Sequence, residues 1–283
     1  MSASGGATAV PQASVAVWLC RAMYFGVQVS STLHHHKAVQ ISVTLGRPLR
    51  VRSSDGQPHF ERQSFIAGAN VPHQMEKTGE PTFLLYAESP ALADFARRLS
   101  VASGSSLPAL PERSLNVILP VLQASGGHLR DEEAGNAIYS HILKTLTGSD
   151  SDEGQGDPRI AAARSLATPE LLTRESRPAE RMAASVHLSS SRFRHLFRSE
   201  MGVSVQSYLL WKRLITALLA NARGLSLTDA ALTAGLTDSA HLSRACRSMF
   251  GMQPSRMFRN GQAFEIIVGA DCTGTDSGFS RLR

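Results

Sequence analysis

The stretch from residue 225 to residue 254, LSLTDAALTAGLTDSAHLSRACRSMFGMQP, constrains the fold more than any other part of the chain. Its first half repeats small apolar residues at helical spacing, which predicts a helix with one closely packing face. Gly235 follows where the chain must turn sharply, because glycine tolerates the left-handed backbone that ends many helices. Asp238 or Ser239 can then cap a second helix, so the pattern predicts a helix-turn-helix. The apolar positions of the two helices are Leu227, Ala230, Ala231, Ala234, Leu242, Ala245, Cys246, Met249 and Phe250.

The same pattern occurs twice in the chain. RSMFGMQ at residues 247–253 aligns with RSEMGVS at residues 198–204, about 49 positions earlier. Phe193, Leu196 and Phe197 supply the apolar face of the earlier second helix, and residues 180–186 supply the helix before it. An internal repeat is stronger evidence than either copy alone, so we predict two helix-turn-helix units.

This tandem arrangement resembles the DNA-binding domain of the AraC/XylS family of bacterial transcription regulators, over roughly residues 157–259. The family's second signature is matched by Ala231, Gly235, Leu236, Asp238, His241, Leu242, Ser243, Arg244, Arg247, Phe250, Gly251 and Pro254. Leu236, Leu242 and Cys246 stand where the family usually has phenylalanine, and His187 occupies the glycine turn of the first copy. We therefore expect the second unit to have the softer core.

Positive charge is concentrated on this repeated segment. Residues 176–260 carry twelve Lys and Arg against four Asp and Glu, whereas the whole chain has a net charge of +6. A basic surface of this kind is expected where a protein meets phosphates, although a solvated basic face without a partner has the same composition. The repeat favours double-stranded promoter DNA as the partner.

The outward positions of the two second helices are candidates for DNA contact. By the resemblance, base contacts are implied for Ser191, Arg194 and His195 in the first unit and for Ser239, Ala240 and Arg244 in the second, with Arg192 and Arg198 also outward and His241 and Arg247 nearer the DNA backbone. An arginine can bind the O6 and N7 atoms of guanine in a bidentate manner. Arg244 has an alternative role, an ion pair with Asp238 that holds the local fold. Lys212 and Arg213, on the helix between the units, are expected to add phosphate contacts.

The N-terminal part shows the two-residue period of β-strands. Val39, Ile41, Val43 and Leu45 alternate with polar residues, and several such runs follow one another between residues 15 and 88. Short strands at close spacing favour a small antiparallel barrel or sandwich. Next to an AraC-type domain, this part resembles the cupin-like sensor domain of many such regulators, whose interior is a pocket for a small-molecule effector.

A histidine cluster in this part is a candidate ligand site. His34 and His36 can point to the same side of a strand, Gln40 follows four residues later, and His73 is a distant third histidine. This order resembles the site of metal-binding cupins, but Gln40 stands where those proteins have a carboxylate, which is the better metal ligand. A metal site, a metal-free ligand pocket and a structural role all stay open. We assign ligand binding to these four residues and expect no metal or other cofactor.

These features predict an α+β protein of two domains: an N-terminal antiparallel cupin-like β-barrel with packing or dimerisation helices, and a C-terminal all-α domain with two helix-turn-helix motifs. The expected segments are a disordered tail (1–13), the sensor domain (14–105), a helical connector that could also dimerise (106–146), a linker (147–158), the DNA-binding domain (159–260) and a mobile tail (261–283). The linker, TGSDSDEGQGDP, has no apolar residue with which to join a core.

The predicted function is a sequence-specific transcription regulator, not an enzyme, controlled by a small-molecule effector. RNA polymerase and a second copy of the chain are the expected protein partners. Cys20, Cys246 and Cys272 lack metal or redox spacing, and no apolar run is long enough to span a membrane, so we expect a cytoplasmic location. The alternatives are a metal-dependent cupin enzyme fused to a DNA-binding module and a non-specific basic protein that coats DNA.

Overall fold

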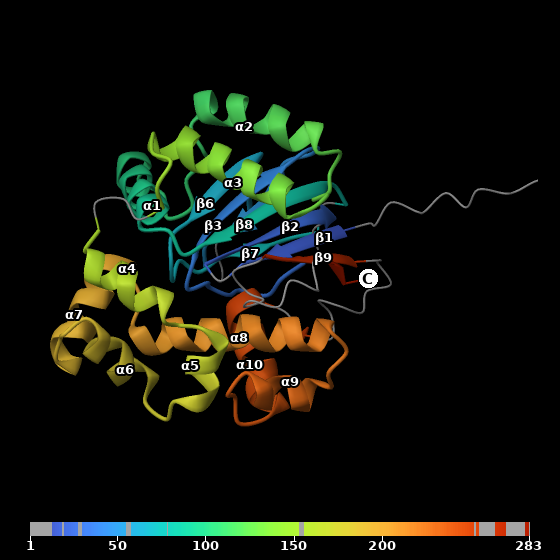
Figure 1. The fold of residues 1–283 in the computed structure, drawn as a ribbon. Helices are drawn as coiled ribbons and strands as arrows, with labels where there is room; N and C mark the ends of the chain where they lie inside the picture. The colour runs from blue at the N-terminus through green and yellow to red at the C-terminus, as the bar shows by residue number, and fades with distance from the viewer. Residues whose placement is uncertain are drawn as a thin grey trace, which may run out of the picture.

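The computed structural model has a sheet-rich N-terminal part and a helical C-terminal part (Figure 1). The predicted α+β organisation in two parts is confirmed. In Figure 1 the sheet and helices α1 to α3 lie above, and helices α4 to α10, in yellow to orange, lie below. The residues that the structure describes are 13–18, 20–27, 30–54, 58–77, 79–152, 156–251, 253–254, 264–269 and 281–282.

The strands of the described residues form two sheets. They are β1 (Ala13–Val17), β2 (Arg21–Val27), β3 (Val39–Thr44), β4 (Leu49–Arg52), β5 (Phe60–Arg62), β6 (Ser64–Ala67), β7 (Gln74–Met75), β8 (Pro81–Ala87), β9 (Phe264–Val268) and β10 (Arg281–Leu282). The larger sheet has the order β10-β9-β1-β2-β8-β3-β6, and the smaller has the order β5-β4-β7. No pairing among the described strands joins β6 to β10, so the larger sheet is open, in contrast to the predicted barrel.

Strand β3 lies between β8 and β6 and is buried along its whole length. Val39, Ile41 and Val43 belong to the core that the large sheet shares with helices α1 to α3. The polar residues between them point to the other face, where Gln40 lies 2.8 Å from a ring nitrogen of His73. The alternation predicted one buried face, but the smaller sheet and the helical part cover the second face as well.

Three helices cover one face of the large sheet: α1 (Pro90–Ser103), α2 (Glu112–Ala124) and α3 (Glu132–Thr147). Ser89 and Asp131 cap the first and third by accepting backbone N–H groups with their side chains. Ile118, Leu122 and Ile142 share one apolar core with the sheet. Residues 106–146, expected as a connector, therefore belong to the packing of the N-terminal part.

Seven helices form the C-terminal part of the described chain. They are α4 (Pro158–Ser165), α5 (Pro169–Arg174), α6 (Pro178–Ser185), α7 (Ser190–Met201), α8 (Val205–Ala222), α9 (Leu227–Thr233) and α10 (Ser239–Phe250). One core lies among α4 to α7 and the start of α8, and another lies among the rest of α8, α9 and α10. Helix α8 enters both cores, so it fixes the position of one helix pair relative to the other.

The prediction of a mobile tail is wrong for residues 264–268. These residues form β9, which lies in the large sheet between β10 and β1 and runs parallel to β1. Ile266, Ile267 and Val268 are buried there, and the Gly269 N–H donates to the Val17 carbonyl at 2.8 Å. An apolar run beside an open sheet edge gains both burial and backbone hydrogen bonds. Residues 1–12 of the expected disordered tail and residues 270–280 lie outside the described chain.

The start of the predicted linker is attached to the N-terminal part. The Asp152 carbonyl accepts the Ala91 N–H and the Ser89 hydroxyl, each at 3.2 Å, and the Asp152 carboxylate accepts the Tyr139 hydroxyl. Residues 153–155 lie outside the described chain. Among the helices described, none has both the length and the apolar character needed to cross a lipid bilayer.

Candidate nucleic-acid interface

The two segments that repeat in sequence have turns of the same geometry. His187, between α6 and α7, has φ 56°, and Gly235, between α9 and α10, has φ 73°. The residues that follow, Leu188 and Leu236, each donate a backbone N–H to an alanine carbonyl of the preceding helix, at 3.0 and 2.9 Å. These bonds satisfy carbonyls that the end of a helix leaves without a partner. His187 therefore takes the place of a turn glycine.

We expect His187→Gly to raise the free energy of unfolding by about 1 kcal/mol, because a side chain in left-handed backbone costs about 1–2 kcal/mol and the greater freedom of unfolded glycine offsets part of the gain. Urea unfolding measures the difference. His187→Ala keeps the strained Cβ and serves as the control. Since His187 is exposed, a loss of stability in the glycine variant would contradict this account of the turn.

Helix α7 presents a basic outer face. Ser189 caps it by accepting the Arg192 N–H, and Phe193 and Phe197 are buried with ring centroids 5.6 Å apart. The predicted contact residues of this helix are all exposed: Ser191, Arg192, Arg194, His195 and Arg198. Their spacing of three, four and seven positions puts them on one side of the helix.

Helix α10 has the same organisation with a smaller core. Leu242, Cys246 and Met249 are buried, whereas the predicted contact residues Ala240, Arg244 and Arg247 are exposed and Ser239 and His241 are half-buried. Asp238 caps the helix by accepting the His241 N–H at 2.6 Å, and this bond lowers the pKa of the Asp238 carboxyl. No ion pair within 4.0 Å joins Asp238 to Arg244 among the described residues, but the Arg244 charge is one of the smaller effects that lower the pKa of the Asp238 carboxyl, so the local role of Arg244 remains an alternative.

The expected phosphate contact of Lys212 is wrong. Its side chain is only 5% exposed, and its Nζ atom lies 2.8 Å from Oε2 of Glu88 in the N-terminal part. Burial is the largest single effect and would lower the pKa of Lys212, but the Glu88 carboxylate together with the neighbouring Tyr208 and Cys20 side chains raises it. Arg213 is half-buried and donates to the Leu172 carbonyl at 3.4 Å. Sequence reasoning missed Glu88, because no local pattern marks a partner so distant in the chain.

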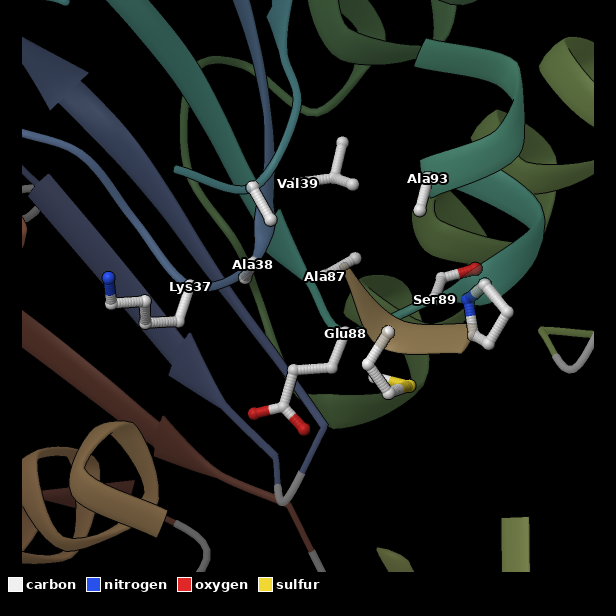
Figure 2. Close-up of a pocket in the computed structure, with 10 residues that line it drawn as sticks. Lys37, Ala38, Val39, Ala87, Glu88, Ser89 and Ala93 are labelled. Atoms are coloured by element: carbon white, nitrogen blue, oxygen red, sulfur yellow. The ribbon is translucent and has the colours of Figure 1, made fainter. Parts of the chain in front are cut away.

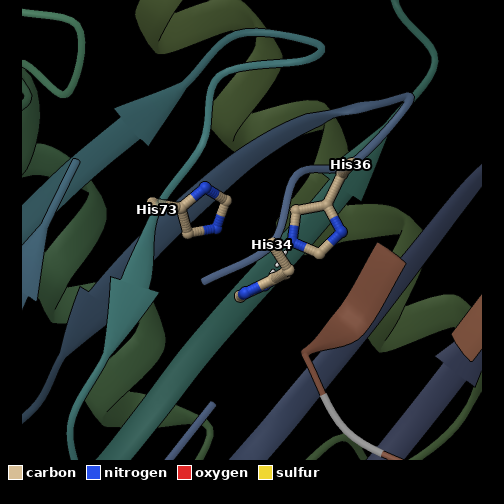
Figure 3. A group of neighbouring side chains, drawn as sticks. All are labelled: His34, His36 and His73. Atoms are coloured by element: carbon tan, nitrogen blue, oxygen red, sulfur yellow. Dashed lines mark hydrogen bonds between the residues drawn. The ribbon is translucent and has the colours of Figure 1, made fainter. Parts of the chain in front are cut away.

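The four predicted ligand residues of the N-terminal part come together. Figure 3 shows the three histidines. His34 and His73 pair through their backbones at 3.0 and 2.8 Å, and Nε2 of His34 lies 3.1 Å from Nε2 of His36. One ring nitrogen from each histidine lies within 4.8 Å of the others. Oε1 of Gln40 lies 2.8 Å from Nε2 of His73. The cluster is buried, and the His36 ring faces Phe250 of α10 at a centroid distance of 5.7 Å.

Burial keeps these imidazoles neutral. It lowers the pKa of His34 to about 4 and that of His73 to about 3, and it lowers the pKa of His36 well below the usual range. Each nearby histidine adds a smaller effect in the same direction. At neutral pH each ring therefore carries one nitrogen with a free lone pair.

Comparisons with known proteins bear on the helical part first. Residues 182–260 match the family described as a helix-turn-helix domain, and these residues include the AraC-type signature. The probable transcriptional regulator LumQ of Photobacterium leiognathi is 24% identical over 230 residues, which cover 80% of this chain and 92% of LumQ. Residues 182–260 therefore form an AraC-type helix-turn-helix domain, and the chain is a DNA-binding transcription regulator.

Two solved structures have a fold similar to that of this regulator. An apo ToxT variant from Vibrio cholerae has a TM-score of 0.53 and 10% identity, and the match covers 84% of the regulator and 95% of ToxT. ToxT from Vibrio cholerae O395 has a TM-score of 0.50 and 13% identity, with 87% and 96% covered. At these identities the similarity concerns the fold alone.

Helices α7 and α10, which are the second helices of the two helix-turn-helix units, both end against the N-terminal part of the regulator. The Gly202 carbonyl, at the end of α7, accepts Nδ2 of Asn70 at 3.2 Å. The Gly251 carbonyl, at the end of α10, accepts the N–H and the hydroxyl of Thr32 at 3.1 and 3.0 Å. A Cβ on Gly251 would lie 2.7 Å from the Thr32 carbonyl, so this close approach requires glycine.

A small pocket lies at the same junction (Figure 2). It is lined by β3, by the end of β8, by the start of α1 and by Met201 of α7. The pocket is small, and its volume of about 240 Å³ includes space that is open to solvent. Glu88 lines the pocket, and Arg164 of α4 donates to the Glu88 carbonyl. Charged residues of the helical part therefore hold the junction closed.

Proposed function

We propose that this regulator binds promoter DNA sequence-specifically through α7 and α10, as two helix-turn-helix units, and that a small-molecule effector bound to its cupin-like N-terminal part controls the binding. The observation that supports the proposal most is that α7 and α10 each follow a turn of the same geometry and each present an exposed face with polar and basic side chains. Helix α8 holds the two faces at a fixed spacing, which suits successive segments of a major groove. An effector would act only by binding two domain arrangements with different affinity.

Sequence choice comes from the side chains that reach base edges. Ser191, Arg194 and His195 serve this role in the first unit, and Ser239, Ala240 and Arg244 in the second. Arg192, Arg198, His241 and Arg247 lie beside them and contact phosphates. Arg194 contributes more of the binding energy than Arg244, because α7 has five exposed polar or basic positions and a phenylalanine core beneath them.

A mobility-shift assay with the DNA upstream of the coding region tests this function. Arg194→Ala should weaken binding by about 1–3 kcal/mol, mainly at one base position, and Arg244→Ala should weaken it less. Arg113→Ala, an exposed arginine on α2, is the matched control and should bind as the wild type does. Equal binding to scrambled DNA at moderate salt would rule out sequence-specific regulation, and an even loss on all sequences would identify a protein that coats DNA.

A metal-dependent enzyme at His34, His36 and His73 is the second candidate, because the three rings converge. The ring of His36 is covered by Tyr86, Trp211 and Phe250, at centroid distances of 4.7, 6.5 and 5.7 Å. A substrate would have to displace α8 and α10 before it reached the imidazoles. This covering favours a regulatory site over a catalytic one, so we propose that the chain is not an enzyme.

The remaining partners follow from the AraC-type domain. We propose that the regulator acts with RNA polymerase in the cytoplasm and that a homodimer occupies paired half-sites, since two-fold dimers suit such sites. Sedimentation of the full chain with and without its promoter DNA would show one or two copies per DNA.

A further inference from the structure

The ring nitrogens of the histidine cluster are oriented by backbone carbonyls. Nδ1 of His34 lies 2.7 Å from the Thr32 carbonyl, and Nδ1 of His73 lies 3.0 Å from the Val71 carbonyl. A carbonyl only accepts, so Nδ1 of His34 carries the proton and donates it. Nε2 of His73 also faces an acceptor, Oε1 of Gln40 at 2.8 Å, so the His73 proton lies on Nδ1 only when the bond to Gln40 is given up, as a metal ion on Nε2 would require. In a neutral ring Nε2 then has a free lone pair. Metal-binding histidines are commonly oriented in this way by a hydrogen bond from the other ring nitrogen.

His36 adds a buried nitrogen that lacks a partner. The residue is 1% exposed, and its Nδ1 has no hydrogen-bond partner among the described residues. Its Nε2 lies 3.1 Å from Nε2 of His34. In a tetrahedral zinc site, with Zn–N bonds of about 2.0–2.1 Å, ligand nitrogens are about 3.3 Å apart. The His34–His36 pair already has this spacing, and small ring movements would bring His73 from within 4.8 Å to the same distance.

We propose that His34, His36 and His73 bind a divalent transition-metal ion, with Zn²⁺ as the representative ion, between the N-terminal part and the DNA-binding helices. Three neutral imidazoles suit Zn²⁺ and its neighbours in the first transition row, whereas Ca²⁺ and Mg²⁺ require oxygen ligands. Water or Oε1 of Gln40 supplies a fourth ligand. Gln40 lowers the expectation of a metal from sequence alone, but the converging rings form a three-histidine site that needs no carboxylate.

The histidine cluster lies next to the segments that hold the ends of α7 and α10, so ion binding can affect both helices. Thr32, which accepts from His34, donates to the Gly251 carbonyl at the end of α10. Asn70, which donates to the Gly202 carbonyl at the end of α7, also donates its backbone N–H to the His36 carbonyl at 2.8 Å. An ion that draws the three rings together therefore moves the two segments that hold these helix ends. This coupling rests on the proposed function, but the metal site itself does not.

Metal titration of the full-length chain tests the site. The protein is stripped with a chelator, dialysed and titrated with Zn²⁺ against a chromogenic chelator, and Co²⁺ reports the coordination through its visible absorption. We expect one ion per chain. His36→Gln and His73→Gln should each lower the affinity by about 100-fold or more, and Zn²⁺ should raise the Tm of the wild type but not of these variants.

His35→Ala is the matched control, because His35 lies in the same run but outside the cluster. It should bind one ion with wild-type affinity. Circular dichroism of each metal-free variant shows whether it folds, so a variant that loses binding because it unfolds is recognised. The metal site is overturned if the wild type binds less than one ion per chain at micromolar Zn²⁺, or if folded His36→Gln and His73→Gln bind as the wild type does.

Promoter mobility shifts with and without Zn²⁺ then test the coupling. We expect Zn²⁺ to change the DNA affinity of the wild type and of His35→Ala by about 5-fold or more, and to leave His36→Gln unchanged. Metal binding without any change in DNA affinity would overturn the coupling. Failure of the wild type to prefer its promoter both with and without Zn²⁺ would overturn the proposed function, and the titration would still decide the metal site.

Discussion

Lys212→Met should lower the free energy of unfolding by about 3–5 kcal/mol, because it leaves the buried Glu88 carboxylate without its nearest cation. The two side chains are 5% and 1% exposed and lie 2.8 Å apart. Replacing both with apolar residues, as in Lys212→Met with Glu88→Leu, should recover most of the loss, since no uncompensated charge then remains. Urea unfolding of the full chain at pH 7 measures all three proteins.

Lys144→Met provides the control for this prediction. Lys144 pairs with Asp150 at 3.2 Å, but both side chains are well exposed. A solvent-exposed pair contributes about 0–1 kcal/mol, so this variant should have nearly wild-type stability. A double variant at positions 212 and 88 that is as unstable as Lys212→Met would show that the loss comes from packing and not from the ion pair.

The second large effect compares equivalent positions of the two helix pairs. Phe197→Ala should cost about 3–5 kcal/mol of unfolding free energy, because the ring packs on Phe193 and Tyr208 at centroid distances of 5.6 and 5.2 Å. Cys246 is also fully buried, but Cys246→Ala removes a single heavy atom and should cost about 1 kcal/mol. Urea unfolding again measures both variants.

This comparison also tests whether the second core is softer. Cys246→Leu should be tolerated better than a change of the same volume at a tightly packed site, since a loose core accommodates added carbons. If Cys246→Ala cost as much as Phe197→Ala, the two cores would be equally rigid, and the weaker DNA contribution that we expect from α10 would lose its physical basis.

The helical repeat could be predicted from sequence because its signals are local. Apolar spacing, the cap at Asp238 and the glycine turn at Gly235 each act within a few residues. The convergence of His34 and His36 is local in the same sense, because residues two apart on an extended chain point the same way. His73 is distant in the chain, and it could be assigned to the same site only because the order of these residues resembles that of the ligands in metal-binding cupins.

The features that sequence reasoning missed depend on partners far apart in the chain. The Lys212–Glu88 pair joins α8 to the end of β8, and no periodicity marks either residue. The parallel pairing of β9 with β1 brings together the two ends of the described chain. The alternation along β3 indicated strands correctly, but closure into a barrel depends on pairings between strand edges, which alternation does not encode.

The pairing of β9 with β1 also determines how the helical domain can move. The domain leaves the N-terminal part after α3 and returns to it at β9, so it is attached at two points instead of hanging from a single linker. A body held at two points rotates about the axis through them and cannot swing freely. A regulatory signal at the junction would therefore produce a rocking motion of α7 and α10 about one hinge axis.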